Sequence, residues 1–171
     1  HLLGIAAVLP RDLAPDERRA CLVALGRAAN HPLTIGQLGS WDLERQSAFI
    51  DRYGLLPSTW SAANRHWATV TPFVFGKYPD TPYGDEAIAL VRESCRLSGL
   101  PEPAAIEVGP VSPVTGVPRA SDFPPLASRP GKPRKCHAHL RLTFAEPVAG
   151  PLLVGWGRYQ GYGLCRPLQE R

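Results

Sequence analysis

The C-terminal stretch 150–171 combines residue types that suit contact with a polyanion carrying flat bases. It reads GPLLVGWGRYQGYGLCRPLQER, and its glycines are Gly150, Gly155, Gly157, Gly161 and Gly163. Glycines this close together cost backbone entropy, which indicates turns at positive φ or main chain pressed against a neighbour. The residues between them that offer a guanidinium or a ring are Trp156, Arg158, Tyr159 and Tyr162. Such a segment can receive phosphate on its amides and bases on its rings. A glycine-rich hairpin that closes a sheet explains the pattern equally well.

A cationic run precedes this glycine-rich segment. Between residues 129 and 141 there is no carboxylate, and the basic residues are Arg129, Lys132, Arg134, Lys135, His137, His139 and Arg141. The whole chain has a formal net charge of only +4, so the positive charge is concentrated late in the sequence. A local cationic field of this kind serves phosphate binding, although a solvated loop has the same composition.

His137 and His139 lie on a predicted strand, 136–144, with the alternating sequence CHAHLRLTF. Side chains two residues apart on a strand share a face, so Lys135 and Arg141 extend the same row. The row would present imidazoles and cations together. Polar residues on the solvent face of an edge strand are the alternative interpretation.

The composition is that of a globular chain. With 171 residues and 44% hydrophobic residues it suits one domain, or two small modules that share a core. No apolar run is long enough to span a membrane, and no signal peptide opens the chain. Because the chain begins at His1, we expect it to be part of a longer one. The four cysteines contain no CxxC pair, which favours buried thiols over a zinc site. Carboxylates at ligand spacing do not accompany the histidines, so metal hydrolase chemistry is disfavoured.

The predicted elements of the first half begin with an apolar strand at 2–9. Pro15 opens a helix with acidic residues in its first turn, a packed stripe that includes Leu22 and Leu25, and an end near Asn30. Residues 33–43 resemble an outer strand with a glycine bulge, and residues 51–65 carry no clear period and read as a loop.

The second half contains a predicted strand at 66–75, a helix at 85–98 capped by Asp85, and a short strand at 105–108. A proline-rich surface excursion follows at 109–135, and then the strand 136–144. The order strand, helix, strand, strand, helix, strand predicts an α+β fold of the ferredoxin-like (split βαβ) kind. An added C-terminal hairpin carries the glycine-rich loop. We treat 1–171 as a single domain.

Three segments together resemble a known family: LLGIAAVLPRDL, WATVTPFVF and HAHLRLTFAEPVAGPLLVGWGRYQGYGL. They are similar to the fused subunit of type I-G CRISPR effector systems, formerly type I-U. The resemblance is to its C-terminal part, which is akin to the CRISPR repeat-processing endoribonuclease of the RAMP superfamily. Members of that superfamily have ferredoxin-like folds and a glycine-rich loop near the C-terminus, which matches Gly155, Gly157, Gly161 and Gly163.

The resemblance implies a role in prokaryotic antiviral defence, in the cytoplasm, without a cofactor. It implies metal-independent cleavage of CRISPR precursor RNA within each repeat, with the product retained in an effector complex alongside other subunits. The chemistry needs a 2′-hydroxyl aligned with its phosphate, a base, an acid and a cation. Histidine suits the proton transfers because its reference pKa is near neutrality.

His137 and His139 are the first candidates for catalytic residues, and His31 is the second, because the catalytic histidine of the superfamily tends to follow the first helix. Each has a plain alternative as a solvent-facing, loop or capping histidine. A histidine upstream of His1 is a further alternative. The predicted RNA-binding residues are Lys132, Arg134, Lys135, Arg141, Gly155, Gly157, Arg158, Tyr159, Gly161, Tyr162 and Gly163. Trp156 is interpreted as a core residue or a packing lid, and Trp60 and Trp67 as residues of the core or of a subunit contact.

Two other classes of function stay open at this point. A non-catalytic subunit would hold the RNA hairpin without cutting it. A protein-interaction domain would dock on a neighbour through the proline-rich stretch 109–135. Cleavage of repeat RNA in the presence of a chelator separates the first from an enzyme, and RNA-independent association identifies the second.

Overall fold

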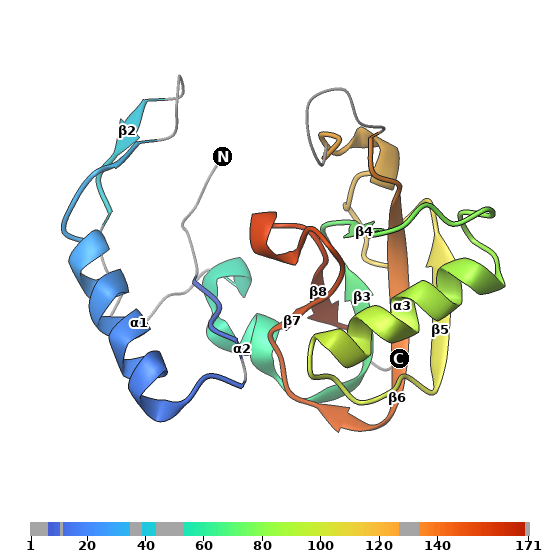
Figure 1. The fold of residues 1–171 in the computed structure, drawn as a ribbon, viewed down its shortest axis with the longest axis horizontal. Helices are drawn as coiled ribbons and strands as arrows, with labels where there is room; N and C mark the ends of the chain where they lie inside the picture. The colour runs from blue at the N-terminus through green and yellow to red at the C-terminus, as the bar shows by residue number, and fades with distance from the viewer. Residues whose placement is uncertain (1–6, 11, 35–38, 44–52, 127–133, 170–171) are drawn as a thin grey trace. The chain divides into compact units, whose positions relative to one another are not determined.

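The structure is a computed structural model that describes residues 7–10, 12–34, 39–43, 53–126 and 134–169. The chain divides into two compact units, His1–Leu56 and Pro57–Arg171, which we call unit 1 and unit 2. Figure 1 shows both as ribbons. Each unit is described by itself.

Unit 1 consists of helix α1 (Pro15–Ala28), a short hairpin of β1 (Leu33–Thr34) and β2 (Ser40–Trp41), and the 3-10 helix η2 (Tyr53–Leu55). Pro15 opens α1 as predicted, and the carboxylate of Glu17 accepts the amide of Ala14, which satisfies a donor at the helix start. The predicted outer strand at 33–43 is two antiparallel strands, not one. No residue of α1 is buried, so the predicted packed stripe is wrong: Leu22 and Leu25 are exposed.

The predicted first strand, 2–9, lies mostly outside the described residues. Its described end, 7–9, has no regular structure, and Val8 is exposed. Among the described residues, the ferredoxin-like pattern begins in unit 2, at a strand that the sequence pattern placed in the middle of the order.

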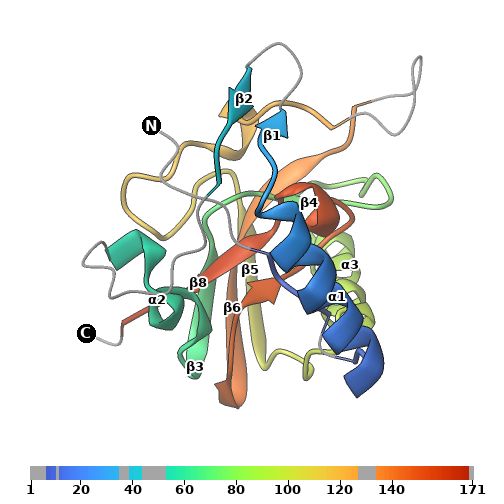
Figure 2. The ribbon, with the colours of Figure 1, turned by 90° about the vertical axis from the view of Figure 1, so that its left-hand side faces the viewer.

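Unit 2 contains a sheet whose neighbouring strands are antiparallel and whose spatial order differs from the order of the strands in the sequence. The strands are β3 (Asn64–Thr69), β4 (Phe73–Val74), β5 (Ala105–Gly109), β6 (His137–Val148), β7 (Leu152–Leu153) and β8 (Leu164–Pro167). β6 pairs with β5 along one edge and with β3 along the other, and β3 pairs with β8. β5 and β3 are thus parallel, with β6 between them, and helix α3 (Asp85–Leu97) connects them (Figure 2). This is a split βαβ unit, so the predicted α+β class is confirmed.

The C-terminal hairpin was also predicted correctly. β7 and β8 pair at Leu152↔Cys165 and Leu153↔Leu164, and the glycine-rich loop joins them. In a complete split βαβ fold, a second crossover helix would connect β6 to β8. The structure describes every residue of this connection, which holds β7 and the 3-10 helix η4 (Arg158–Gln160) in place of that helix. Before β3 lies the short helix α2 (Pro57–Ser61), where the sequence pattern predicted a loop.

The predicted strand 66–75 is interrupted. β3 ends at Thr69 and β4 resumes at Phe73, and both pair with β6, at Ala68↔Arg141 and Phe73↔Ala138. The interruption is a bulge of the kind that re-aims side chains beside a site. Thr71 in this bulge accepts the amide of Leu164 on its hydroxyl, at 3.0 Å, which ties the bulge to β8.

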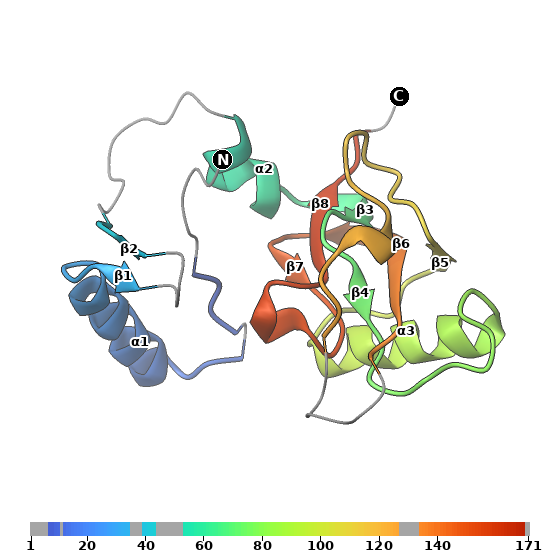
Figure 3. The ribbon, with the colours of Figure 1, turned by 90° about the horizontal axis from the view of Figure 1, so that it is seen from above.

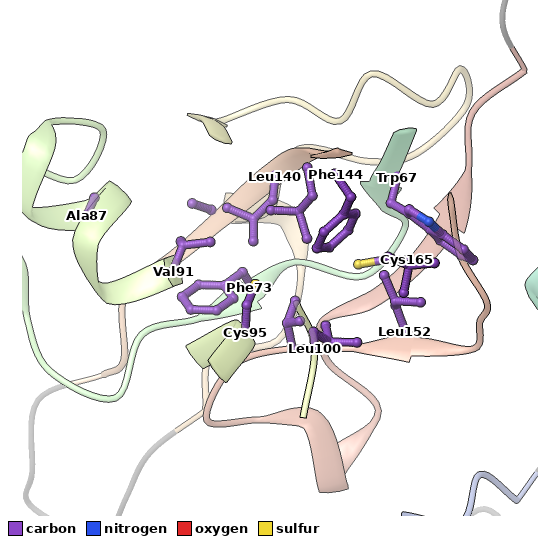
Figure 4. Packing of buried hydrophobic residues seen from close by; sticks show 14 of the residues in the cluster. Trp67, Phe73, Ala87, Val91, Cys95, Leu100, Leu140, Phe144, Leu152 and Cys165 are labelled. Carbon is purple, nitrogen blue, oxygen red and sulfur yellow. The ribbon is translucent and has the colours of Figure 1, made fainter. Parts of the chain in front are cut away.

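The core of unit 2 lies between α3 and the sheet (Figures 3 and 4). Ala87, Val91 and Cys95 recur at a spacing of four residues and form the buried stripe of α3. They pack with the inward residues of the sheet, which are Trp67, Phe73, Phe75, Ala138, Leu140, Leu142, Phe144, Leu152, Val154 and Cys165. Trp67 is therefore a core residue, as one of its interpretations predicted. Burial raises the pKa of the Cys95 thiol to about 12, so it is an inert core group.

Candidate nucleic-acid interface

The amides of the glycine-rich loop donate inside the protein. Gly155 N donates to Ser94 Oγ at 2.8 Å, Trp156 N to Val74 O at 2.9 Å, and Gly163 N to Pro72 O at 2.9 Å. A phosphate nest requires amides that point together at a vacant site. These amides instead fix the loop to the β3–β4 bulge and to α3, so the expected phosphate cradle is not formed by them.

The glycines serve close packing. A Cβ on Gly155 would lie 2.9 Å from the ring of Phe73, and one on Gly157 would lie 2.9 Å from the side chains of Leu126 and Tyr162. At Gly163 it would lie 1.7 Å from the carbonyl oxygen of Val154. Gly155, Gly161 and Gly163 also have positive φ. The alternative interpretation, a glycine-rich hairpin that closes a sheet, is the one these contacts support.

The two tyrosines of the loop differ in exposure: Tyr162 is enclosed, whereas Tyr159 is available to solvent. Tyr162 is only 9% exposed, and its hydroxyl donates to Pro124 O, so its faces cannot stack on a base in this structure. Tyr159 is 76% exposed, and the guanidinium of Arg158 lies 4.6 Å from its ring centre. Arg158 also donates to Gly155 O at 3.2 Å. η4 therefore presents a guanidinium and a ring together to solvent.

His139 is a structural residue. It is 1% exposed; its Nδ1 lies 3.0 Å from Thr69 Oγ1 and its Nε2 3.0 Å from Pro118 O. Pro118 O can only accept, so Nε2 carries the proton. Thr69 Oγ1 accepts the amide of Leu140 at 2.8 Å and donates to Nδ1. Burial lowers the pKa of His139, which favours this neutral form. The expectation that His139 transfers protons to RNA is not supported, because both of its nitrogens are occupied.

His137 differs from its neighbour in the row. It is half-buried, and its Nε2 is enclosed without a hydrogen-bond partner among the described residues. Its ring lies 5.2 Å from that of Tyr162. Burial has the largest effect on the pKa of His137 and lowers it. A hydrogen bond with the backbone of Ala120 has a smaller effect and raises the pKa. His137 is thus a mainly neutral imidazole with one unused ring nitrogen.

The two ends of the row reach solvent. The ammonium of Lys135 donates to Gly76 O and lies 5.1 Å from the ring centre of Trp156. Arg141, at the other end, pairs with Glu107 on β5 at 3.7 Å. Lys132 lies outside the described residues. The shared face that the alternation predicted is real, but its members range from buried to exposed.

An open cavity of about 610 Å³ lies beside the start of β6, near the 3-10 helix η3 (Ala120–Asp122). Its polar and aromatic lining consists of Tyr83, Arg119, Ser121, Asp122, Phe123, Arg134, Lys135 and His137. We call it the η3 pocket. Three cations face one carboxylate, and that carboxylate is occupied: Asp122 accepts the amide of Arg119 at 3.1 Å and the hydroxyl of Ser121 at 3.1 Å.

Residues 109–126, the described first part of the proline-rich stretch 109–135, form one wall of this pocket and are more than a surface excursion. Ser112 is buried and donates to Thr69 O at 2.6 Å, and Ala120 is 2% exposed. Phe123 lies edge-on to His139, with ring centres 6.0 Å apart. The stretch follows the face of the sheet opposite α3 because β6 presents hydrogen-bonding and aromatic partners there.

Next to the pocket, aromatic rings and cations form an exposed surface. Trp156 is 40% exposed and stands beside Gly76, whose Cβ position would lie 3.9 Å from the ring. Tyr78 is 62% exposed and donates to Arg134 O at 2.8 Å. We call Tyr78, Arg134, Lys135 and Trp156 the aromatic–cationic surface. Exposed rings with cations over them are the arrangement that binds single-stranded nucleic acid.

The sequence matches the family described as CRISPR-associated protein, GSU0054 family, over residues 1–167. The chain belongs to this family. No curated protein and no solved structure matches it. Membership places the chain in a CRISPR system and is in keeping with the predicted CRISPR resemblance at that level.

In this CRISPR-associated chain the predicted site residues are only partly brought together. Arg134, Lys135 and His137 meet at the η3 pocket, whereas His139 is enclosed and Arg141 is paired on the sheet. His31 is exposed, directly after α1, and belongs to unit 1. Among the described residues, no three His, Cys, Asp or Glu side chains gather as metal ligands, and no helix is long and apolar enough to cross a membrane.

Sequence reasoning missed Arg119, Tyr78 and Tyr83, and it interpreted Trp156 as a core residue or a packing lid. The available signal was the local composition: Tyr78 and Tyr83 are in the loop between β4 and α3, where nothing requires a large ring for packing. Exposed aromatic residues in a loop are more informative about binding than buried ones.

Proposed function

We propose that this CRISPR-associated protein binds repeat RNA through the aromatic–cationic surface. The observation that carries the proposal is Lys135, held over the exposed ring of Trp156 by its bond to Gly76. The pair offers a stacking face and a charge at one point. Stacking on such a ring contributes roughly 1–3 kcal/mol per base, and the cation meets the adjoining phosphate.

The proposed RNA is unpaired where it meets this surface. A ring can stack on a base only when that base has left its own stack, which favours loops and single-stranded flanks over a continuous duplex. Arg134, and Arg158 with Tyr159 on η4, supply further charge and stacking of the same kind. The other subunits of the effector complex are the expected setting for such a bound RNA.

A second proposed function, cleavage of the precursor RNA, is favoured by one observation: His137 lines the same pocket as Arg119, Arg134 and Lys135. A neutral imidazole suits the removal of the proton from a 2′-hydroxyl. The freed oxygen attacks the adjacent phosphorus, the bond to the 5′-oxygen breaks, and the departing oxygen takes up a proton, for which the ammonium of Lys135 is the acid that the pocket offers. The arginines stabilise the charge that builds on the phosphate. This route uses His137 and leaves His139 as a support.

One experiment tests both functions. Labelled repeat RNA is incubated with the protein in chelator at several salt concentrations, and binding and chain cutting are followed on gels. For binding, Trp156→Leu and Lys135→Gln are compared with Arg96→Gln, which removes an exposed cation from α3. For cleavage, His137→Gln is compared with His66→Gln, a partly buried histidine of the same sheet that does not line the pocket.

We expect Trp156→Leu and Lys135→Gln each to weaken binding about tenfold, which corresponds to about 1.4 kcal/mol, while Arg96→Gln does not. RNA that never binds refutes the first function. RNA that binds but stays intact with the unmodified protein refutes cleavage and leaves binding in place. One cut per repeat that is lost in His137→Gln and kept in His66→Gln supports the enzyme.

A further inference from the structure

The η3 pocket has the size and lining of a site for one small ligand. Cavities that enclose small molecules range from roughly 300 to 1,000 Å³, and this one is about 610 Å³. The ring of Phe123 and the ring of Tyr83 supply flat apolar surface, and three cations supply charge.

The pocket is held in place without a ligand. Ala120 N donates to Pro110 O at 3.0 Å, and Pro118 O accepts from His139 at 3.0 Å. Asp122 closes η3 on the amide of Arg119. These bonds fix the backbone of the η3 wall, so a ligand loses little free energy in ordering that part of the site.

His137 indicates what kind of group the ligand carries. Its enclosed Nε2 has no partner among the described residues, and an unsatisfied buried polar atom is unfavourable in the free protein. A neutral polar group on a ligand would satisfy it. A phosphate is a poor partner for this nitrogen. An anion prefers a charged imidazole, and burial disfavours the charged form of His137. The anion belongs with Arg119 and Arg134.

We infer that the η3 pocket binds a single nucleotide turned out of the RNA. Its phosphate pairs with Arg119 and Arg134, and its base lies against Phe123 or Tyr83. A polar edge of the base or a ribose hydroxyl pairs with His137 Nε2 once the ring turns this enclosed nitrogen toward the pocket. The inference rests on the proposed RNA binding and deepens it: the aromatic–cationic surface holds the strand, and the pocket takes one unpaired unit of it.

The test uses the full chain and small probes. Titration calorimetry measures the binding of the four ribonucleoside 5′-monophosphates, of ribose 5-phosphate and of inorganic phosphate. We expect at least one mononucleotide to bind ten times more tightly than ribose 5-phosphate, because only the nucleotide supplies a base. Arg119→Gln should weaken that mononucleotide at least tenfold, while Arg96→Gln leaves it unchanged.

His137→Phe provides a signature that a merely structural role would not give. It keeps an aromatic ring beside Tyr162 and removes the unpartnered nitrogen, so the melting temperature should rise by about 2–4 °C. In the same variant the preferred mononucleotide should bind at least fivefold more weakly. A variant that is more stable and binds equally well would overturn the role of Nε2. Arg119→Gln, on an exposed side chain, tests the pocket even if His137→Phe does not fold.

The outcomes separate the inference from the function on which it rests. In one outcome, repeat RNA binds in a manner that depends on Trp156 and salt, mononucleotides bind no more tightly than phosphate, and Arg119→Gln has no effect. That outcome overturns the nucleotide site in the pocket and leaves the proposed RNA binding in place. Absence of RNA binding overturns the function, and with it the assignment of the pocket to RNA.

Discussion

Gly161 and Gly163 form a matched pair that tests what the glycine-rich loop is for. Both have positive φ, +83° and +68°, so an alanine at either position adopts a strained backbone. They differ in their surroundings. A Cβ on Gly161 would meet nothing within 4 Å, whereas one on Gly163 would lie 1.7 Å from the carbonyl oxygen of Val154. Comparing the two alanine variants isolates the packing term.

The magnitudes follow from the local contacts. The left-handed conformation costs an alanine roughly 1–2 kcal/mol, which is the whole effect expected for Gly161→Ala. In Gly163→Ala the loop must also move away from Val154, which breaks the bonds from Val154 N to Gly163 O at 3.0 Å and from Gly163 N to Pro72 O at 2.9 Å. Each of these contributes about 0.5–1.5 kcal/mol, so Gly163→Ala should cost roughly 2–5 kcal/mol.

Urea unfolding measures the two free energies directly, with the RNA affinity of each folded variant measured beside it. Gly161→Ala should bind RNA like the unmodified protein. Equal destabilisation by the two substitutions would refute the packing argument. Loss of RNA affinity in Gly161→Ala at its expected stability would restore the loop as a phosphate cradle.

Three further predictions concern the sheet and its surface. Thr69→Val keeps the shape of the side chain but leaves Leu140 N and His139 Nδ1 without their hydrogen-bond partner. It should lower the free energy of unfolding in urea by about 2–5 kcal/mol, and a loss below about 1 kcal/mol would contradict the role of Thr69 in holding both groups. The free energy of unfolding should fall as the pH is lowered through about 6.5, because burial lowers the pKa of His137 and His139 in the folded state and the unfolded chain takes up protons first. Unfolding midpoints from pH 8 to 5 measure this dependence, and His137→Phe should make the midpoint depend less on pH. RNA affinity should weaken steeply with salt, and Lys135→Gln should reduce the slope of log K against log salt by about 0.7; an unchanged slope would show that Lys135 does not contact phosphate.

The fold of unit 2 could be predicted from local patterns. The helix 85–98 has a stripe at helical spacing and a stop at Gly99 and Pro101, and the structure ends it at Leu97. The strands 105–108 and 136–144 alternate and are present as β5 and β6. What the patterns could not give was the pairing. Within the described part of the chain, the first strand of the split βαβ unit is β3, and the end of the chain supplies its partners β6 and β8.

The candidate site was predicted less completely, for a physical reason. Alternation tells which side chains share a face, but it does not tell what covers that face. His137, His139 and Arg141 do lie on one side of β6, and Ala138 and Leu140 between them fill the core. Lys135, just before the strand begins, lines the same pocket as His137. The cover over the middle of the row is the stretch 109–126, whose prolines read as surface because they lack periodicity. Its hydrogen bonds to Thr69 and His139 have no signature in the sequence.

That cover also explains why the row changes character along its length. Where Pro118 and Phe123 lie against the strand, His139 becomes a neutral support with both nitrogens bound. Two residues earlier on the strand, His137 lines the η3 pocket, and its enclosed Nε2 has no partner among the described residues. A further step places Lys135 beside Trp156 at the surface. Going backward along the chain, His139 supports the pocket wall, His137 lines the pocket, and Lys135 belongs to the aromatic–cationic surface. A residue pattern that suggested two equivalent catalytic histidines therefore yields one candidate that lines the pocket, His137, and one residue, His139, that holds the pocket wall in place.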